Sequence, residues 1–445
     1  MSKFYEKSGK FVYVDFKQFQ KLVINDIKKG AEKGDPEDQF ALGFLYLTGD
    51  GVAKNLSEAL KWFLKAAAQG DTDAMFNLGL MYAEGEGVTQ DFTEALKWWQ
   101  KAADMGHPES IFNIGLAYIN GDGVEQNSSQ AAKYFLEAAE LGDSDAQYNL
   151  GVMFYEGDGV KQDKSEAVKW LLKSAEQGNS DAQNNLAVIY ENGDGVTQDY
   201  SEALKWRIKA AEQGDLDAMF DLGVSYENGD GVEQNYSEAL KWYRKAAKEG
   251  HPDAIFNLGT MYANGEGVAK NMSQAAKFWR KAAELGIIQA QVNLAHMYKE
   301  GDGVKKNIPE AVKLYRQAAE KGNPQAQFVL GIMYYNGDGV EQDKSEAVNL
   351  WREAAEQGFA PAQGNMGNVY FRGEEVKKDP AQAVKWWRKA AKQEDPIAQF
   401  NLGLMYVQGI GVKKNASEAI KLWRKAARQG HTMAQDALRE LGKKW

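Results

Sequence analysis

The side chains most often used in catalysis are few in this chain, and their spacing does not bring them together. It contains four histidines and no cysteine. His107, His251 and His431 each follow a glycine at the start of a predicted helix, where we expect a capping or turn role. His296 replaces an apolar residue inside a helix, and we expect it to make a surface or groove contact. We therefore predict no catalytic residue, and the lack of cysteine excludes thiolate metal sites and a cysteine nucleophile.

A recurring turn of the type Gly-acid-Gly could in principle bind calcium or phosphate. Gly49-Asp50-Gly51-Val52 is one example. These turns lack the alternating Asp and Asn ligands of a calcium loop, and no Gly-Lys-Ser/Thr follows them to hold phosphate. We interpret them as helix-ending turns whose glycines allow a positive φ. Carboxylate pairs are too numerous for any one to be singled out, so we predict no metal site and no cofactor.

A regular series of asparagines has a sharper functional interpretation. An Asn amide can donate to and accept from a peptide main chain. If the helices that carry these residues lie roughly 9–10 Å apart, one Asn would meet about every third residue of an extended strand, which advances about 3.3 Å per residue. The alternative is that each Asn bonds to the neighbouring repeat. The series consists of Asn77, Asn113, Asn149, Asn185, Asn257, Asn293, Asn365 and Asn401, with Asp221 in phase.

The elements that position these residues follow from an internal period of 36 residues. Asn-Leu-Gly occurs at 77–79, 149–151, 257–259 and 401–403, at intervals that are all multiples of 36. Eleven units run from Pro36 to His431 without insertion or deletion. We therefore divide the chain into an N-terminal segment with a capping helix (1–35), eleven repeats (36–431) and a C-terminal capping helix (432–445).

Each unit predicts two helices. The first, helix A, starts at Asp, Asn or His, often before Pro as in Asp35-Pro36, and ends at the glycine turn. The second, helix B, starts with Asp/Asn-x-x-Glu/Gln, as in Asn55 to Glu58, which predicts a capping box in which the carboxylate reaches back to a free amide. Alanines and Trp62 in its body predict close helix packing, and Gly70 ends it.

Two aromatic series run through the A helices. We expect the series that precedes the asparagines, which includes Phe40, Phe76 and Phe112, to serve packing. The tyrosine series from Tyr46 to Tyr406, interrupted by Phe154, is predicted to lie in the core.

These motifs carry a family resemblance. Leu42, Gly43 and Tyr46, with the alanines of helix B, resemble the tetratricopeptide family. The longer unit and the motif Ala-Gln-x-Asn-Leu-Gly-x-Met-Tyr-x-x-Gly-x-Gly-Val are similar to its Sel-one-like repeat branch, over residues 36–445. Residues 15–33 look like a lone helix B, and Ala434, Gln435 and Leu438 look like a lone helix A.

The resemblance implies an all-α fold, a right-handed α/α superhelix or solenoid whose concave wall consists of A helices. It also implies a scaffold or adaptor for protein complexes, often in bacteria, with the asparagines in the binding groove. Some secreted members have disulfides between their helices, which this chain cannot form.

Composition excludes some partners and favours a compartment. With 53 Lys and Arg against 63 Asp and Glu, the net charge is −10 and no basic block stands out, which disfavours nucleic acid and anionic membranes. No signal-peptide core or membrane-spanning run is present. We expect a cytoplasmic protein, although export without a cleaved signal would leave the same sequence.

Repeats eight to ten depart most from the consensus and are predicted to hold the specialised part of the groove. Gly364 removes an aromatic side chain, while Lys299 and Arg372 supply positive charge that would suit an acidic side chain or a C-terminal carboxylate. The alternative is drift near a less constrained end. The other departures are Ile287, Ile288, Val292, His296, Asn368, Phe371, Glu375 and Glu394.

Three functions follow in order of preference. The first is a non-enzymatic scaffold or adaptor that binds a protein or peptide segment on the helix A face. The second is an exported effector or host-interaction protein that uses the same surface. The third is a regulatory subunit or an enzyme with a hidden site. The sequence does not identify the partner or the oligomeric state.

Overall fold

The computed structural model describes residues 2–5, 11–14 and 16–444, and side chains from residue 21 onward. This part of the chain contains 24 α-helices and two β-strands. The strands, β1 (Ser2–Tyr5) and β2 (Phe11–Val14), pair antiparallel with Ser2 opposite Val14. The hairpin was not predicted. The expected helix over 15–33 is α1 (Phe16–Lys33), and Asp15 lies outside the described residues.

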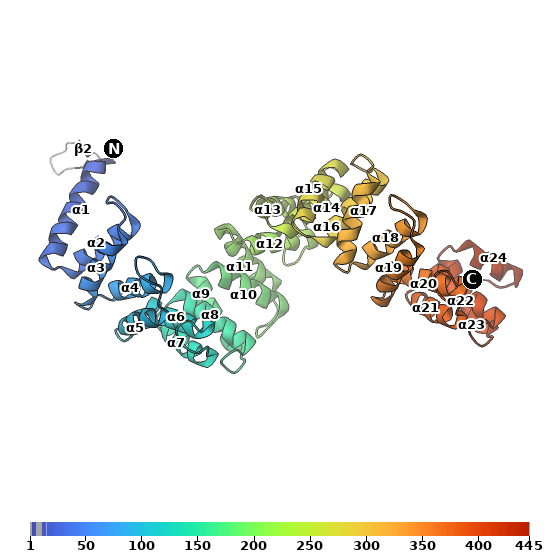
Figure 1. Cartoon of the computed structure of the whole chain (residues 1–445), viewed down its shortest axis with the longest axis horizontal. Coiled ribbons are helices and arrows are strands. Elements are labelled where there is room, and N and C mark those ends of the chain that lie inside the picture. Colours follow the sequence, from blue (N-terminus) through green and yellow to red (C-terminus); the bar gives the residue numbers. More distant parts are fainter. Residues whose placement is uncertain (1, 6–10, 15, 445) are drawn as a thin grey trace. The chain divides into compact units, whose positions relative to one another are not determined.

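Helices A and B alternate along the chain in repeats of about 36 residues (Figure 1). The A helices are α2 (Pro36–Thr48), α4 (Thr72–Glu84), α6 (Pro108–Asn120), α8 (Ser144–Glu156), α10 (Ser180–Asn192), α12 (Leu216–Asn228), α14 (Pro252–Asn264), α16 (Ile288–Glu300), α18 (Pro324–Asn336), α20 (Ala360–Arg372) and α22 (Pro396–Gln408). The B helices are α3 (Leu56–Ala67), α5 (Phe92–Ala103), α7 (Ser128–Glu140), α9 (Lys164–Glu176), α11 (Tyr200–Gln213), α13 (Tyr236–Lys248), α15 (Met272–Glu284), α17 (Ile308–Glu320), α19 (Lys344–Glu356), α21 (Pro380–Lys392) and α23 (Ala416–Arg428). The last helix is α24 (Thr432–Glu440).

The chain forms two compact units. The first contains residues 1–222 with 230–232, and the second contains residues 223–229 with 233–445. Within the units, helix A packs against the helix B that follows it, as in α8 with α9 and α20 with α21. Each helix B then packs against the next helix A, as in α9 with α10. The predicted α solenoid is confirmed, because successive helix pairs stack in this order.

The predicted starts of the A helices are confirmed by side-chain hydrogen bonds. Asp71 Oδ1 accepts from the Ala74 amide at 2.7 Å. The histidines that share this position also cap: His107 Nδ1 accepts from the Ser110 amide at 3.2 Å, and His251 and His431 cap in the same way. Ile287 and Phe359 replace the polar residue at the starts of α16 and α20, where no side-chain cap bond forms.

One half of the predicted capping box at helix B is wrong. Asn55 Oδ1 does accept from the Glu58 amide, at 3.1 Å. However, the Asn55 amide donates to the carbonyl of Tyr46 on helix A, at 2.8 Å, and Glu58 pairs with Lys61 instead. All eleven repeats make the equivalent backbone bond. The first residue of helix B is thus tied to the last turn of helix A, and its amide is not available to a carboxylate.

Each helix A approaches its helix B closely beneath a bulky side chain. A Cβ added to Gly79 would lie 2.2 Å from Trp99 Nε1, and one added to Gly43 would lie 2.7 Å from the Phe63 ring. Trp99 Nε1 donates to the Phe76 carbonyl of helix A at 3.2 Å. The aromatic residues that precede the asparagines also serve packing, as expected, because the Phe112 ring contacts Phe135 at a centroid distance of 5.5 Å.

The tyrosine series from Tyr46 to Tyr406 is half-buried, and members such as Tyr46 and Tyr118 pack against the buried core, so its prediction as core holds only in part. The hydroxyls reach the surface, where several accept a hydrogen bond from an arginine of the preceding helix B. Arg280 donates to Tyr298 at 2.9 Å, and Arg316 donates to Tyr334 at 2.9 Å. The phenol ring therefore covers the junction between repeats and keeps its polar end near water.

A pair of glutamines joins many helix A starts to both neighbouring B helices. Buried Gln147 donates to the Ala139 carbonyl of the preceding helix B at 3.1 Å. Its own carbonyl accepts from Gln177, at the end of the following helix B, at 2.8 Å. The same pair occurs as Gln39 with Gln69, Gln183 with Gln213, Gln327 with Gln357, Gln363 with Gln393, and Gln399 with Gln429.

Candidate protein-binding surface

The asparagine series lies on the A helices and is half-buried throughout. Its hydrogen bonds fall into two classes. Asn77 and Asn149 each donate to the carbonyl four residues earlier in their own helix, at 2.8 Å. Asn401 contacts Asn368 of the preceding repeat at 3.5 Å, and Asn185 bonds to the hydroxyl of Tyr148. Some of these amides bond across repeats and others bond within their own helix. Peptide binding by the series and bonding to the neighbouring repeat therefore both stay predictions.

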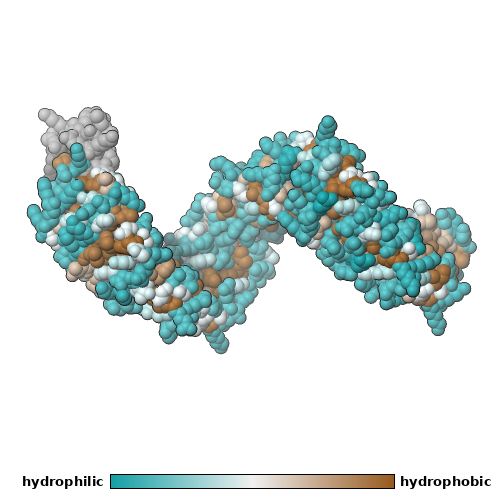
Figure 2. Space-filling model, in the orientation of Figure 1, coloured by the Kyte–Doolittle hydropathy of each residue, from teal (hydrophilic) through white to brown (hydrophobic). Residues whose placement is uncertain are grey.

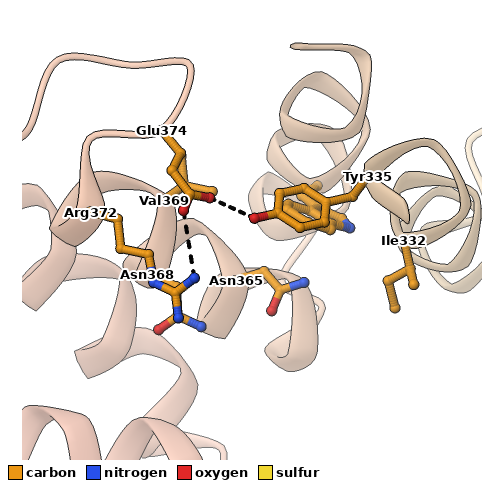
Figure 3. A pocket seen from close by; sticks show the side chains of 8 residues that line it. Ile332, Tyr335, Asn365, Asn368, Val369, Arg372 and Glu374 are labelled. Atoms are coloured by element: carbon orange, nitrogen blue, oxygen red, sulfur yellow. Dashed lines mark hydrogen bonds and ion pairs between the residues drawn. The ribbon is translucent and has the colours of Figure 1, made fainter. Parts of the chain in front are cut away.

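Three of the sequence-predicted residues meet in one pocket of about 240 Å³ between α18, α19 and α20. They are Asn365, Asn368 and Arg372. In Figure 3, Tyr335 and Ile332 of α18 lie across the pocket from these residues of α20. The complete lining is Ile332, Tyr335, Trp351, Asn365, Asn368, Val369, Arg372 and Glu374.

An acidic side chain organises the rim of this pocket. The Tyr335 hydroxyl donates to Glu374 Oε2 at 2.8 Å, and Arg372 Nη1 lies 3.6 Å from Glu374 Oε1 (Figure 3). The hydrogen bond to Glu374, together with burial, raises the pKa of Tyr335. Tyr335 is therefore neutral at physiological pH and is held as a wall of the pocket.

The predicted positively charged recess is wrong. Arg372 is paired with Glu374, so the two charges at this rim cancel. Lys299 does not line the pocket; its Nζ lies 2.6 Å from Glu300. It lies at the end of α16, two repeats before the repeat that contains Arg372. The two cations therefore do not form a joint carboxylate site.

The remaining candidates occupy other positions on the A helices. His296 is exposed, and its predicted contact stays a prediction, while Asn293 Oδ1 accepts from Gln289 at 3.0 Å. Phe371 packs on Trp387 with the ring centroids 5.6 Å apart. Asn113 and Asn257 are half-buried. A Cβ added to Gly364 would meet nothing within 4 Å, so the missing aromatic leaves open space at the start of α20.

A second pocket, in the first compact unit, was not predicted. It lies between α8, α9 and α10 and is lined by Val152, Tyr155, Glu156, Leu171, Asn185, Val188 and Ile189. Tyr155 and Tyr335 stand at the same repeat position, 180 residues or five repeats apart. The equivalent residues of repeats one to three are Leu47, Ala83 and Ile119, so a tyrosine at this position is the signal that could have located both pockets.

The described residues were also compared with the requirements of a metal site and of a membrane-spanning helix. Among the residues that the structure describes, no three His, Asp or Glu side chains are grouped to hold a metal ion. In the same part of the chain, no helix has both the length and the apolar character that a membrane crossing needs. In the view of Figure 2, hydrophilic residues cover most of the surface and separate the apolar patches.

Comparison with known proteins identifies the repeat. The Sel1 repeat model matches eleven consecutive segments, 36–71, 72–107, 108–143, 144–179, 180–215, 216–251, 252–287, 288–323, 324–359, 360–395 and 396–431. This chain belongs to the Sel1 repeat family. The family assignment confirms the resemblance inferred from the motifs, and Sel1 repeat proteins are generally protein-interaction scaffolds.

The solved structures that are similar to this Sel1 repeat chain include two with more than 30% identity. One is c5321, a protective antigen present in uropathogenic Escherichia coli strains, at 37% identity and a TM-score of 0.84; the match covers 94% of this chain and 90% of that one. The other is a Sel1 repeat protein from Oxalobacter formigenes, at 34% identity and a TM-score of 0.59, with 69% and 90% covered. No curated protein matches the chain.

Proposed function

We propose that this Sel1 repeat protein is a non-enzymatic scaffold or adaptor that binds an extended protein segment along its A helices. The observation that supports this most directly is the pocket between α18, α19 and α20, where three residues selected from the sequence converge. The family supports the same class of function, because its members are generally interaction scaffolds.

The pocket has the size and lining to hold one side chain of a partner. Its volume of about 240 Å³ is below the roughly 300–1,000 Å³ of sites for drug-sized ligands. Ile332, Val369 and Trp351 offer apolar surface. The amides of Asn365 and Asn368 would bond to the partner's main chain beside the inserted side chain. We therefore expect an apolar side chain here rather than the acidic group inferred from the sequence.

A second candidate function is interaction with a host after export. It is favoured by the similarity to c5321, which is a protective antigen of uropathogenic Escherichia coli strains. The same helix A surface would then bind a host protein. The two candidates differ in the source of the partner and not in the mode of binding.

A pull-down with the full chain tests both candidates. Tagged protein is exposed to an extract of the producing cell and, separately, to host secretions, and a stoichiometric partner is identified and titrated. We expect the combined change of Asn365 and Asn368 to Ala to weaken binding at least tenfold, or about 1.4 kcal/mol. The control is Asn120→Ala, at the end of α6, which should leave binding unchanged. Equal affinity of wild type and the double variant would contradict the proposal.

A further inference from the structure

The pocket in the first unit is a repeat-equivalent of the pocket just described, with different chemistry. Val152, Tyr155 and Leu171 correspond to Ile332, Tyr335 and Trp351 five repeats later. Asn185 corresponds to Asn365, so a member of the asparagine series lines both. The pocket in the first unit has a volume of about 220 Å³. As in the later pocket, this space fits one side chain better than a small-molecule ligand.

Tyr155 forms one wall of this pocket. Tyr155 is long enough to reach the next glycine turn, where its hydroxyl donates to Asp194 Oδ2 at 2.6 Å. Lys164 fixes the same carboxylate at 2.7 Å and lies 4.9 Å from the centre of the Tyr155 ring. Behind it, Leu171 lines the pocket where the later pocket has Trp351. The tyrosine wall is thus common to both pockets, whereas the side chain behind it differs.

The lining of this pocket is largely apolar, and part of it is exposed to solvent. Val152, Leu171 and Ile189 surround it, and Val188 is 38% exposed on α10. In the later pocket, Asn368 replaces Val188. Because apolar surface gains free energy when it is removed from water, an apolar side chain of a partner is favoured here over a polar one.

The charge around the pocket indicates which kind of residue stands next to that apolar side chain in the partner segment. Glu156 lines the pocket and is exposed, and no Lys, Arg or His among the described residues forms an ion pair with it. Lys164, which lies over the Tyr155 ring, is already paired with Asp194. Residues 1–222 contain 21 Lys and Arg against 37 Asp and Glu. A partner segment that carries positive charge would thus be attracted both locally and at long range.

We propose that the pocket between α8, α9 and α10 is a second anchor site, which binds an aromatic or large aliphatic side chain next to a Lys or Arg in a partner segment. The site rests on the proposed function, since it assumes a segment bound along the A helices. The new inference specifies which residue types that segment contains. The apolar side chain fills the pocket against Leu171 and Val188, and the adjacent cation pairs with Glu156.

The probe is a phage-displayed library of random 12-residue peptides, selected against the full chain. We expect the selected peptides to be enriched in an aromatic or large aliphatic residue with Lys or Arg within two positions. Val188→Gln should weaken binding of the synthesised peptides at least tenfold. The matched control is Phe44→Gln, which changes an exposed apolar residue, 46% exposed, at the same repeat position of α2.

The charge is tested separately with Glu156→Gln. Affinity should fall three- to tenfold for peptides with the cation and stay constant for the same peptides with that residue replaced by Gln. Glu84→Gln, at the same repeat position of α4, should leave both unchanged. Acidic selected peptides, or peptides indifferent to Val188→Gln, would overturn the inference. If those peptides still bind more weakly after Asn365 and Asn368 are changed to Ala, the proposed scaffold function stands without the second anchor site. If no peptide is selected, both the scaffold function and the anchor site are contradicted.

Discussion

A glycine in nine of the eleven A helices sets how closely the helix approaches its partner, and single methyl groups test this; α10 and α16 have Ala187 and Ala295 there. We expect Gly79→Ala to destabilise the folded protein by about 1–3 kcal/mol, because the new Cβ would lie 2.2 Å from Trp99 Nε1 where α4 packs closely on α5. The control is Gly364→Ala in α20, where a Cβ meets nothing within 4 Å. It should stabilise by about 0.5–1 kcal/mol through helix propensity. Urea unfolding compares the two, and equal effects would contradict the close-approach interpretation.

The glutamine pairs are expected to behave as coupled residues. Gln147→Met alone should cost about 1–2 kcal/mol, because the buried bond to Ala139 disappears and Gln177 loses one of its two acceptors, keeping the Gly142 carbonyl. Adding Gln177→Met should recover part of this loss, since repeat two has Met75 and Met105 at these positions. A double-mutant cycle measured by urea unfolding gives the coupling. Strictly additive changes would show that the pair is not a unit.

At the residue scale, sequence reasoning located the asparagines but not what surrounds them. The position of Asn365 on helix A followed from the period, whereas its neighbours Tyr335 and Glu374 belong to another repeat and to a turn. Periodicity specifies which face a residue occupies but not which charge lies opposite. The sequence therefore predicts a free cation at Arg372, whereas in the structure Glu374 lies beside it.

At the element scale, the glycine turn is packed against the preceding repeat. We expect Gly123→Val to cost about 1–3 kcal/mol, because φ is 72° and the new Cβ would lie 2.8 Å from the Phe92 backbone at the start of α5. Gly142→Val has a φ of 101° but meets nothing within 4 Å, so it should cost less. Hydrogen exchange of Gly123→Val should show that amide protection is lost near α5 to α7. A loss spread over all repeats would contradict local packing.

The chain itself shows that the strain at these turns is tolerable. Glu375 occupies the position of Gly123 with a φ of 56°, and Glu394 occupies that of Gly142 with a φ of 67°. Ser345 of the preceding repeat donates to Glu375 at 2.7 Å, which offsets part of the strain. These two departures from the consensus therefore alter turns and do not line the pocket of α18 to α20.

The caps of the A helices predict a pH dependence. Burial, reinforced by Asp145, raises the pKa of Asp143 above its usual 3.8, although the bond to the Ala146 amide opposes this. The folded state then holds the proton more tightly than the unfolded state, so stability falls as the pH rises through the range just above 3.8. Asp143→Asn should flatten this slope and keep the cap, because Asn179 caps α10 in the same way. Urea unfolding from pH 3.5 to 6 measures it, and an unchanged slope would contradict the assignment.

Element boundaries were predictable because each helix depends on local signals that recur every 36 residues. Helix starts at Asp35 and Asn55 followed from capping chemistry, and helix ends followed from glycine. The capping box failed where a long-range contact decided the outcome, since the Tyr46 carbonyl takes the Asn55 amide. The hairpin of β1 and β2 lies outside the repeat, where the period gives no information.

At the scale of the whole molecule, charge is divided unevenly between the two compact units. Residues 1–222 contain 21 Lys and Arg against 37 Asp and Glu, whereas residues 223–445 contain 32 against 26. The first part thus has a net charge of −16 and the second +6, a contrast that the total of −10 conceals. Basic partners should be attracted to the first unit, in keeping with the charge proposed for its pocket.

This division predicts that salt acts on the two units differently. Like charges in the first unit repel one another, and the Debye length falls from about 30 Å at 0.01 M to about 8 Å at 0.15 M salt. Raising NaCl over this range should therefore stabilise the first unit more than the second. Because solenoid repeats contact their neighbours, the response should be local and visible as greater hydrogen-exchange protection in α4 to α10 than in α14 to α22. Sucrose, which carries no charge, serves as the control and should protect both sets of helices alike. Equal protection of the two units by NaCl would show that the charge imbalance contributes nothing measurable to their free energy of unfolding.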